Sequence, residues 1–363
     1  MAADLPTSRS KSKPVAGDAP IFDVRGLVKH YPVGSGFRLR RNTRFIQAVD
    51  GVDFAIRKGE TLGLVGESGC GKTTVARTLM RLEEPSAGEA LFHGKDIFRA
   101  NAADLKHMRR RIQMIFQDPY ASLNPRMRVE QIIAEPWVIH ADVLPRSQWA
   151  ARVSELLESV GLLPDHAQRY PHEFSGGQRQ RIGIARALAL NPEILVCDEP
   201  VSALDVSVQA QVVNLLERIQ STFHIACLFI AHDLAVVRHM SHRIAVMYLG
   251  RIVEIGTVEK VYKTPRHPYT KALLSAQPRI DFTKEGRVDR ILLQGEVPSP
   301  ASPPSGCRFR TRCWKAQALC AEQSPPLLAD RPDHQVACHF PVEPTDATPP
   351  AAGTRSMPVS ASR

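Results

Sequence analysis

The apolar residues of this chain fall into short runs that predict strands, separated by stretches with the periodicity of helices. Residues 48–56 alternate between apolar and polar side chains, as expected for a half-buried strand, and residues 61–65 are continuously apolar, as expected for a buried one. Strands that alternate with helices form parallel sheets with crossover connections, so the pattern predicts an α/β fold with a parallel sheet. The alternating runs at the start of the chain predict an antiparallel β layer that leads into it. The runs that predict strands are residues 21–28, 48–56, 61–65, 89–93, 110–116, 193–197, 225–230, 243–248 and 250–256.

Composition divides the chain into an ordered body, a cysteine-bearing region and two tails. Residues 1–20 and 342–363 are rich in small, polar and proline residues with little to bury, so we expect both to be disordered. The main ordered domain should cover residues 21–270. Helical periodicity between residues 118 and 190 predicts an α-helical insertion between two sheet strands. Prolines and cysteines mark residues 271–341 as a small C-terminal domain.

A glycine-rich segment, Gly66-Glu-Ser-Gly-Cys-Gly-Lys-Thr73, follows the apolar run at 61–65 and precedes a predicted helix. This is the phosphate-binding loop pattern in the strand–loop–helix setting that it requires. Glycines let successive backbone N–H groups point at phosphate oxygens, and the helix adds its positive end. Lys72 is expected to reach the β- and γ-phosphates, and the Thr73 hydroxyl to ligate Mg²⁺. The sequence therefore predicts a nucleotide site.

Composition and charge argue against a membrane-spanning or secreted protein but do not identify the partner of the chain. The 363 residues are 43% hydrophobic, and the apolar runs stay well below the roughly 18–20 residues that span a bilayer. The first 20 residues contain no apolar signal segment, so we expect a cytosolic chain. A net charge of +10 suits solubility, a nucleic-acid partner or an anionic membrane face, but no aromatic-interleaved RNA-binding pattern accompanies the arginines.

Polar residues at predicted strand ends supply the chemistry around this loop. Asp198 and Glu199 close the strand at 193–197; Asp198 is expected to hold Mg²⁺ beside Thr73, and Glu199 to polarise a water in line with the γ-phosphate. His232 ends the next strand and can reach the γ-phosphate or the attacking water. Gln117 ends its own strand and can contact Mg²⁺ or water in the same way. Taken singly, the acidic pair is also compatible with a helix cap, and the histidine with a polar strand end.

A second glycine-rich stretch, Phe174-Ser-Gly-Gly-Gln178, opens a predicted helix that runs to about Leu190. It offers a hydroxyl, close backbone approach and a positive helix end, so it could be a second anion site. Two such sites with one phosphate loop suggest a nucleotide shared between subunits. The alternative is a glycine-rich helix cap.

In their order along the chain, these motifs resemble those of ABC transporter ATPases over about residues 21–270. The resemblance implies a head-to-tail dimer with two ATP molecules, each between one subunit's phosphate loop and the other's Ser175, Gly177 and Gln178. It implies that Tyr31 stacks on adenine and that Asp205 couples the two sites. The residues of the chain's own ATP and Mg²⁺ site would be Gly66, Glu67, Ser68, Gly69, Cys70, Gly71, Lys72, Thr73, Thr74, Gln117 and Asp198.

Three further segments, residues 118–126, 266–270 and 295–300, resemble the ATPases of dipeptide and oligopeptide importers. The extended basic stretch between Tyr31 and Ala48 resembles the second of the two ATPases that such systems use. The resemblance implies ATP-driven peptide uptake at the cytoplasmic face of the inner membrane, with a paralogous ATPase subunit, two membrane permeases and an extracytoplasmic solute-binding protein as partners. A homodimer, and a nickel chelate or glutathione as cargo, stay open. A nucleic-acid-associated ATPase is the alternative of another class; we expect no direct nucleic-acid contact.

Four cysteines, Cys307, Cys313, Cys320 and Cys338, lie close together near the C-terminus. No C-x-x-C pair is present, so a zinc ribbon is a poor match, and disulfides are not expected in a cytosolic chain. Four thiolates could ligate a [4Fe–4S] cluster, and the same region in this importer family resembles one that does. Zinc and unliganded thiols are the alternatives.

Overall fold

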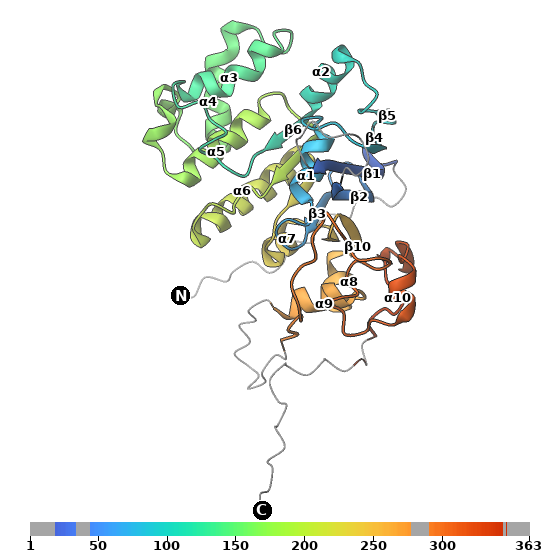
Figure 1. Ribbon diagram of the computed structural model, residues 1–363. Helices are drawn as coiled ribbons and strands as arrows, with labels where there is room; N and C mark the ends of the chain where they lie inside the picture. Colours follow the sequence, from blue (N-terminus) through green and yellow to red (C-terminus); the bar gives the residue numbers. More distant parts are fainter. Residues whose placement is uncertain (1–18, 34–43, 277–289, 344–345, 347–363) are drawn as a thin grey trace, which may run out of the picture. The chain divides into compact units, whose positions relative to one another are not determined.

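The computed structural model describes residues 19–33, 44–276, 290–343 and 346 (Figure 1). The two expected tails fall mostly outside these residues. The chain divides into two compact units, each assembled from separate stretches of sequence. The first unit comprises residues 1–23, 54–62 and 90–228, and the second comprises residues 24–53, 63–89 and 229–363.

The sheet of the first unit is parallel, as the strand–helix alternation predicts. Strands β8 (Ala226–Ile230), β7 (Ile194–Asp198) and β6 (Ile112–Ile115) follow one another in that order. The pairing of β6 with β7 runs in register from Ile112 opposite Ile194. Every residue of β7 is buried, which explains its uninterrupted apolar sequence.

The α-helical insertion of the expected fold is confirmed. Helices α3 (Val129–Ile139), α4 (Trp149–Ser159) and α5 (Gly176–Leu188) lie together in Figure 1. Trp137 is fully buried among them, and its indole Nε1–H donates to the carbonyl of Ala189 at 2.9 Å. Short 3-10 turns connect the helices at Arg146–Gln148, Pro164–Gln168 and Pro171–Glu173.

One strand of this unit begins later than the sequence predicts. The expected strand from Arg110 starts at Ile112, because the two preceding arginines form the last turn of α2 (Ala102–Arg111). The Asn101 side chain caps the start of α2 by accepting the N–H of Asp104, and cations are favourable at the negative end of a helix. The unit also contains β5 (Lys95–Asp96), which pairs antiparallel with β4 (Ala87–Phe92), and α6 (Val206–Phe223).

The second unit contains two groups of strands. In one, β2 (Arg44–Ile56), β1 (Phe22–Val33) and β4 are neighbours in that order, and β2 begins four residues before the predicted strand. In the other, the order is β11 (Leu328–Arg331), β12 (His334–Val336), β10 (Arg251–Thr257), β9 (Arg243–Tyr248) and β3 (Thr61–Val65). Strands β9 and β10 form the expected hairpin. The helices are α1 (Lys72–Leu79), α7 (Leu234–Met240), α8 (Val258–Lys263), α9 (Pro268–Ser275) and α10 (Ala318–Glu322).

A buried polar cluster joins the C-terminal strands to α9. The Glu254 side chain on β10 has no exposure; it accepts the backbone N–H groups of Arg266 and His267, each at 2.8 Å, and lies 2.7 Å from His334 Nε2. Arg266 also donates from Nε to Asp330 at 2.6 Å. Because buried charged groups are stable only when paired and hydrogen-bonded, this cluster specifies how β10, β12 and α9 fit together. Within the described part of the chain, no helix combines the length and apolar character needed to cross a membrane.

Burial of His267 predicts a loss of stability in acid. His267 is 1% exposed and its Nδ1 accepts the N–H of Tyr269 at 3.1 Å, and burial lowers its pKa to about 3. In the unfolded chain the pKa is near 6.5, so the unfolded state binds a proton that the folded state excludes. Stability should therefore fall as pH drops from about 6.5 towards 3, by about 1.4 kcal/mol per pH unit from this group.

The variant H267N keeps a capping acceptor but removes the titration. Urea unfolding at pH 7 and pH 4.5 should show the wild type losing about 2–3 kcal/mol more than H267N over this range. Equal losses in the two proteins would show that His267 is not held neutral by the fold.

Candidate functional site

The loop at residues 66–71 joins the buried strand β3 to α1 and depends on two glycines. A Cβ atom at Gly66 would lie 2.2 Å from the carbonyl oxygen of Met247, and one at Gly71 would lie 2.0 Å from that of Ala48. Gly71 also has a φ of 111°, which other residues adopt only under strain. Only glycine therefore allows the backbone to follow this path, which turns inward around Lys72.

Lys72 lies inside the curl of the loop. Its side chain is nearly buried, and its Nζ donates to the carbonyls of Gly66 at 2.8 Å and Glu67 at 3.0 Å. An ammonium held among backbone groups at the start of a helix is a suitable place for phosphate oxygens. Thr73 is the second residue of α1, as the motif requires.

Glu67 is held by two residues whose contact with the loop the sequence did not reveal. The backbone N–H of Glu67 donates to the Tyr269 hydroxyl at 2.9 Å. Its carboxylate accepts three hydrogen bonds from the two Nη atoms of Arg312, the shortest at 2.9 Å. Tyr269 stands in the segment 266–270, but nothing in that segment indicated a partner so distant in sequence.

In the first unit, the structure brings together two of the three predicted catalytic residues. Asp198 ends β7 and is buried, and Glu199 follows with a φ of 44°. Gln117 Nε2 donates to Glu199 Oε2 at 2.9 Å and approaches the Ser202 hydroxyl at 3.4 Å. A left-handed glutamate is uncommon and is found where the surroundings enforce it, frequently at functional sites. Ser202 is an additional member of this group that we did not predict for the site.

The second glycine-rich stretch is a complete helix cap in the isolated chain. Ser175 Oγ accepts the N–H of Gln178 at 3.4 Å, and Gln178 Oε1 accepts the N–H of Ser175 at 3.0 Å, which is a capping box for α5. Gly177 faces α6, where a Cβ would lie 2.3 Å from Val208 Cγ1. Close packing of α5 on α6 is therefore one reason for glycine at this position. Asp205 stands at the N-cap position of α6.

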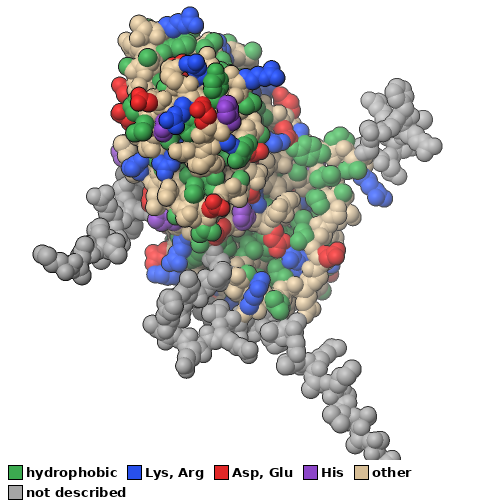
Figure 2. Space-filling model, turned by 90° about the vertical axis from the view of Figure 1, so that its left-hand side faces the viewer, with side chains coloured by type: hydrophobic (Ala, Val, Ile, Leu, Met, Phe, Trp, Pro, Cys, Tyr) green, Lys and Arg blue, Asp and Glu red, His purple; other side chains and the backbone are tan. Residues whose placement is uncertain are grey.

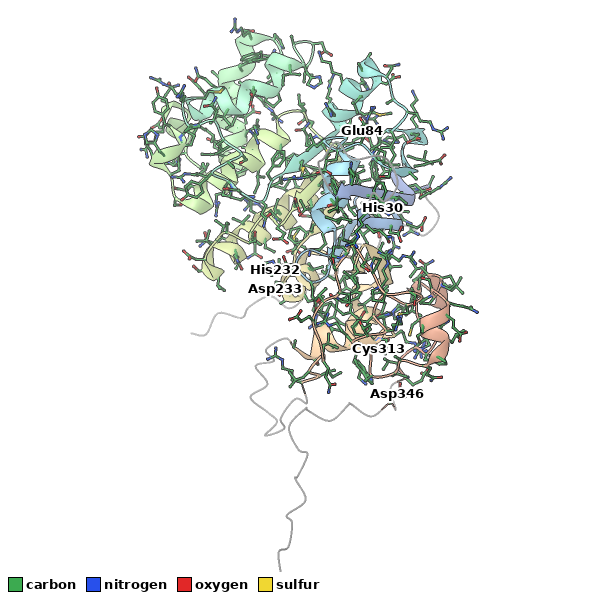
Figure 3. All side chains as sticks on the ribbon, viewed as in Figure 1. His30, Glu84, His232, Asp233, Cys313 and Asp346 are labelled. Carbon is green, nitrogen blue, oxygen red and sulfur yellow. The ribbon has the colours of Figure 1, made fainter. Side chains whose placement is uncertain are left out.

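Tyr31 and His232 belong to the second unit. The Tyr31 hydroxyl donates to the Glu83 carboxylate, and Lys29 Nζ lies 4.8 Å from the centre of the ring. His232 is exposed between β8 and α7, next to Asp233, whose side chain caps α7 by accepting the N–H of Ala235 at 2.7 Å (Figure 3). The predicted site residues thus divide between the units, with Gln117, Ser175, Asp198, Glu199 and Asp205 in the first and Tyr31, residues 66–74 and His232 in the second.

The predicted iron–sulfur cluster is wrong. Cys307, Cys313, Cys320 and Cys338 are free thiols, and among the described residues no three or more His, Cys, Asp or Glu side chains are arranged to hold a metal ion. Burial raises the pKa of Cys313 to about 11 and that of Cys338 to about 12, so without a metal these thiols are protonated at neutral pH. The absence of such an arrangement among the described residues applies equally to the zinc alternative.

Comparison with known proteins bears on both parts of the chain. Residues 49–202 match the family model described as ABC transporter, and residues 253–320 match the one described as oligopeptide/dipeptide transporter, C-terminal region. The chain is 53% identical over 326 residues to the oligopeptide transport ATP-binding protein AppF of Bacillus subtilis, covering 90% of this chain and 98% of AppF. It is 54% identical over 293 residues to OppF of Haemophilus influenzae, covering 81% of this chain and 88% of OppF.

Solved structures with a similar fold are ATP-binding cassettes. A dimeric post-hydrolysis structure of the cassette MJ0796 bound to ADP and Pi has a TM-score of 0.57 at 26% identity, covering 65% of this chain and 98% of that one. CbiO1 of Clostridium perfringens, described as part of the ABC transporter complex cbiONQ, has a TM-score of 0.59 at 27% identity, covering 68% and 92%. The expected α/β fold class is confirmed by these neighbours.

The contact of Gly177 with Val208 leads to a prediction about stability. G177A forces a Cβ into α6 and should cost about 1–3 kcal/mol of unfolding free energy, because an overpacked interface must shift. G177A/V208A should recover most of that loss. The matched control is G183A on the same helix, where an added Cβ meets nothing within 4 Å and should stabilise by about 0.5–1 kcal/mol. Chemical denaturation of the four proteins decides the point, and a G177A protein as stable as wild type would contradict the packing role.

Proposed function

Because the chain belongs to the family of ABC transporter ATP-binding proteins that serve oligopeptide and dipeptide transport, we propose that it hydrolyses ATP to drive peptide uptake through membrane permeases. The observation that carries this proposal is the joint presence, in one chain, of the ABC transporter match and the C-terminal match specific to oligopeptide and dipeptide transporters. A phosphate loop alone would indicate only nucleotide binding.

The phosphate loop and its helix form the ATP site in this proposal. Lys72, already inside the loop, pairs with the β- and γ-phosphates, and the backbone N–H groups of residues 68–74 surround them. The missing side chains at Gly66 and Gly71 keep the loop narrow, which fits it to a polyphosphate chain. Tyr31 stacks on the adenine. Because Lys29 Nζ now lies over the Tyr31 ring, the Lys29 side chain must move away before the adenine can stack there.

The residues present also suit Mg²⁺. The ion prefers oxygen ligands, and the Thr73 hydroxyl, the Asp198 carboxylate and the Gln117 side-chain carbonyl are oxygen donors. Since Gln117 directs its Nε2 to Glu199, its Oε1 is left to face another partner. Bound Mg²⁺ would neutralise charge on the phosphates.

Glu199 acts as the general base for the attacking water, with Gln117 as its positioning partner. The hydrogen bond between them orients the carboxylate, and the left-handed backbone of Glu199 fixes the direction in which its side chain leaves the end of β7. His232 completes the group by contacting the γ-phosphate.

A partner subunit completes each site. Ser175 and Gln178 cap their own helix in the single chain, so a partner's γ-phosphate would bind at the N-terminus of α5, beside a cap already formed. The cassette MJ0796, which was solved as a dimer bound to ADP and Pi, is a precedent for a dimer of such chains. We propose a paralogous ATPase as the partner, with a homodimer as the alternative, and Asp205 as the coupling residue between the two sites.

Membership of the family supports membrane permeases as partners, and we propose the rest of the assembly with them. Two permeases and an extracytoplasmic solute-binding protein would supply the path and the specificity, placing this chain at the cytoplasmic face of the inner membrane. Other small solutes such as nickel chelates or glutathione are alternatives as cargo. A nucleic-acid partner is less well supported, because on the face shown in Figure 2 basic side chains are interspersed with acidic and hydrophobic ones rather than gathered in a stripe.

Replacement of Glu199 by Gln tests the catalytic proposal. E199Q should lower kcat by at least about 100-fold, because removal of a general base costs about that much. Binding of MgATP should stay within about twofold of wild type, since the carboxylate contacts water and not the nucleotide. E217Q, on the middle of α6, is the control and should leave kcat unchanged. Unchanged turnover in E199Q would remove Glu199 from the mechanism.

Purification from detergent-solubilised membranes tests the partners. We expect two permease subunits and a related ATPase to co-purify with the tagged full-length chain, and hydrolysis by the isolated chain to be slow until that ATPase is added. Hydrolysis that is stimulated by nucleic acid, with no membrane protein in the purified complex, would favour the alternative class.

A further inference from the structure

The second residue of the phosphate loop, Glu67, is held by the C-terminal part of the chain. Arg312 Nη1 donates to Glu67 Oε2 at 2.9 Å and to Oε1 at 3.2 Å, and Arg312 Nη2 donates to Oε1 at 3.2 Å. Bidentate pairs of this kind restrict direction as well as distance. The conformation of the Glu67 side chain is therefore set by a residue 245 positions further along the chain.

Both groups that hold Glu67 are rigidly supported. The Arg312 side chain is only 9% exposed, and its guanidinium lies 6.0 Å from the centre of the Tyr248 ring. Tyr269, which accepts the Glu67 N–H, is fully buried and packs against Tyr248 and Phe309 with ring centres 4.7 and 5.4 Å away. Because packed aromatic side chains rarely change rotamer, the hydrogen bonds from Arg312 and to Tyr269 hold Glu67 in a preorganised position.

The same C-terminal segment reaches a second element of the candidate site. Arg308 donates to the Asp50 carboxylate and the Gln47 side chain on β2 and to the carbonyl of Leu249. Asp50 in turn lies 3.2 Å from His30, which precedes Tyr31 on β1. Burial alone would raise the pKa of Asp50, but hydrogen bonds and charges from Arg251 and Arg308 lower it overall, so the carboxylate stays ionised and paired.

The charge on Glu67 matters because of where it lies. An unpaired carboxylate on the phosphate loop would repel the phosphates that the loop is expected to receive, and the low exposure of Arg312 limits the screening of its charge by solvent. Arg312 neutralises this charge while pulling the side chain towards the aromatic cluster. Glu67 thereby contributes a fixed loop conformation without opposing the ligand.

We propose that Arg312 is a positioning residue for ATP binding, which acts by neutralising and orienting Glu67 of the phosphate loop. The inference rests on the proposed role of residues 66–73 as the ATP site. It assigns the C-terminal region a task in nucleotide binding, in addition to whatever it contributes to transport. Hydrolysis itself is not expected to depend on the pair once ATP is bound.

The test is MgATP binding to the full-length chain, measured by displacement of a fluorescent N-methylanthraniloyl-ATP, together with steady-state hydrolysis in the assembled transporter. R312A should raise the dissociation constant and KM about tenfold and change kcat less than about twofold, as expected for loss of a charge-assisted pair that acts on binding. R312K should recover part of the affinity, since lysine restores the charge but not the fork.

The double variant separates charge from general disruption. E67Q removes the repulsion that R312A uncovers, so R312A/E67Q should bind MgATP more tightly than R312A. R310A is the matched control, because the Arg310 side chain donates to the carbonyl and hydroxyl of Ser305, away from the phosphate loop, and it should bind as wild type. K72A reports on the proposed ATP site itself and should lose binding.

Two outcomes would overturn the inference. R312A with wild-type affinity while K72A has lost binding shows that the loop holds ATP without help from Arg312. R312A/E67Q no better than R312A shows that the loss comes from damaged packing and not from an exposed charge. Binding by K72A equal to wild type would instead contradict the proposed ATP site on which the inference rests.

Discussion

The close approach of backbone to backbone at Gly66 and Gly71 is the constraint on which the candidate site depends. Carbonyl oxygens of Met247 and Ala48 occupy the space that side chains would need, so the loop lies directly against β9 and β2. These backbone contacts fix the outer side of the loop, and the Lys72 side chain occupies its inner side. Strand β3, which is buried along its full length, ends where the loop begins, and α1 begins where the loop ends. Without the two glycines neither the position of the lysine nor that of the helix end could be kept.

Several residues expected to bind a nucleotide already have partners in the isolated chain, and this limits what the chain can do alone. Ser175 and Gln178 satisfy each other, and Gln117 is bonded to Glu199. A site composed of such groups is preorganised, because each side chain is oriented before the ligand arrives. In the proposed dimer, the capped N-terminus of α5 would be the part of this chain that meets the partner's nucleotide.

The C-terminal region contributes to the candidate site through arginines and aromatic rings and not through its cysteines. Arg308 and Arg312 tie this region to β2 and to the phosphate loop, respectively. Arg266, which precedes the region, donates to Asp330 on β11 within it. The cysteines lie within the same small fold as protonated, half-buried or buried thiols. Spacing alone misled because four cysteines within a short stretch satisfy the count for a cluster without satisfying its geometry.

The sequence by itself determined the local features: the strand–loop–helix around Lys72, the parallel strands, the helical insertion and the identity of Glu199 as a strand-end carboxylate. Each depends on neighbouring residues or on short periodic patterns, which one sequence displays directly. Only the tertiary structure decided the pairing of Gln117 with Glu199, the capture of Glu67 by Arg312 and Tyr269, and the start of β6 after α2. The contact between Glu67 and Arg312 joins residues 245 positions apart, and a single sequence does not show directly which distant residues meet. The start of β6 depends on whether the arginines before it join the helix or the strand, and element boundaries are the least certain part of a prediction from sequence.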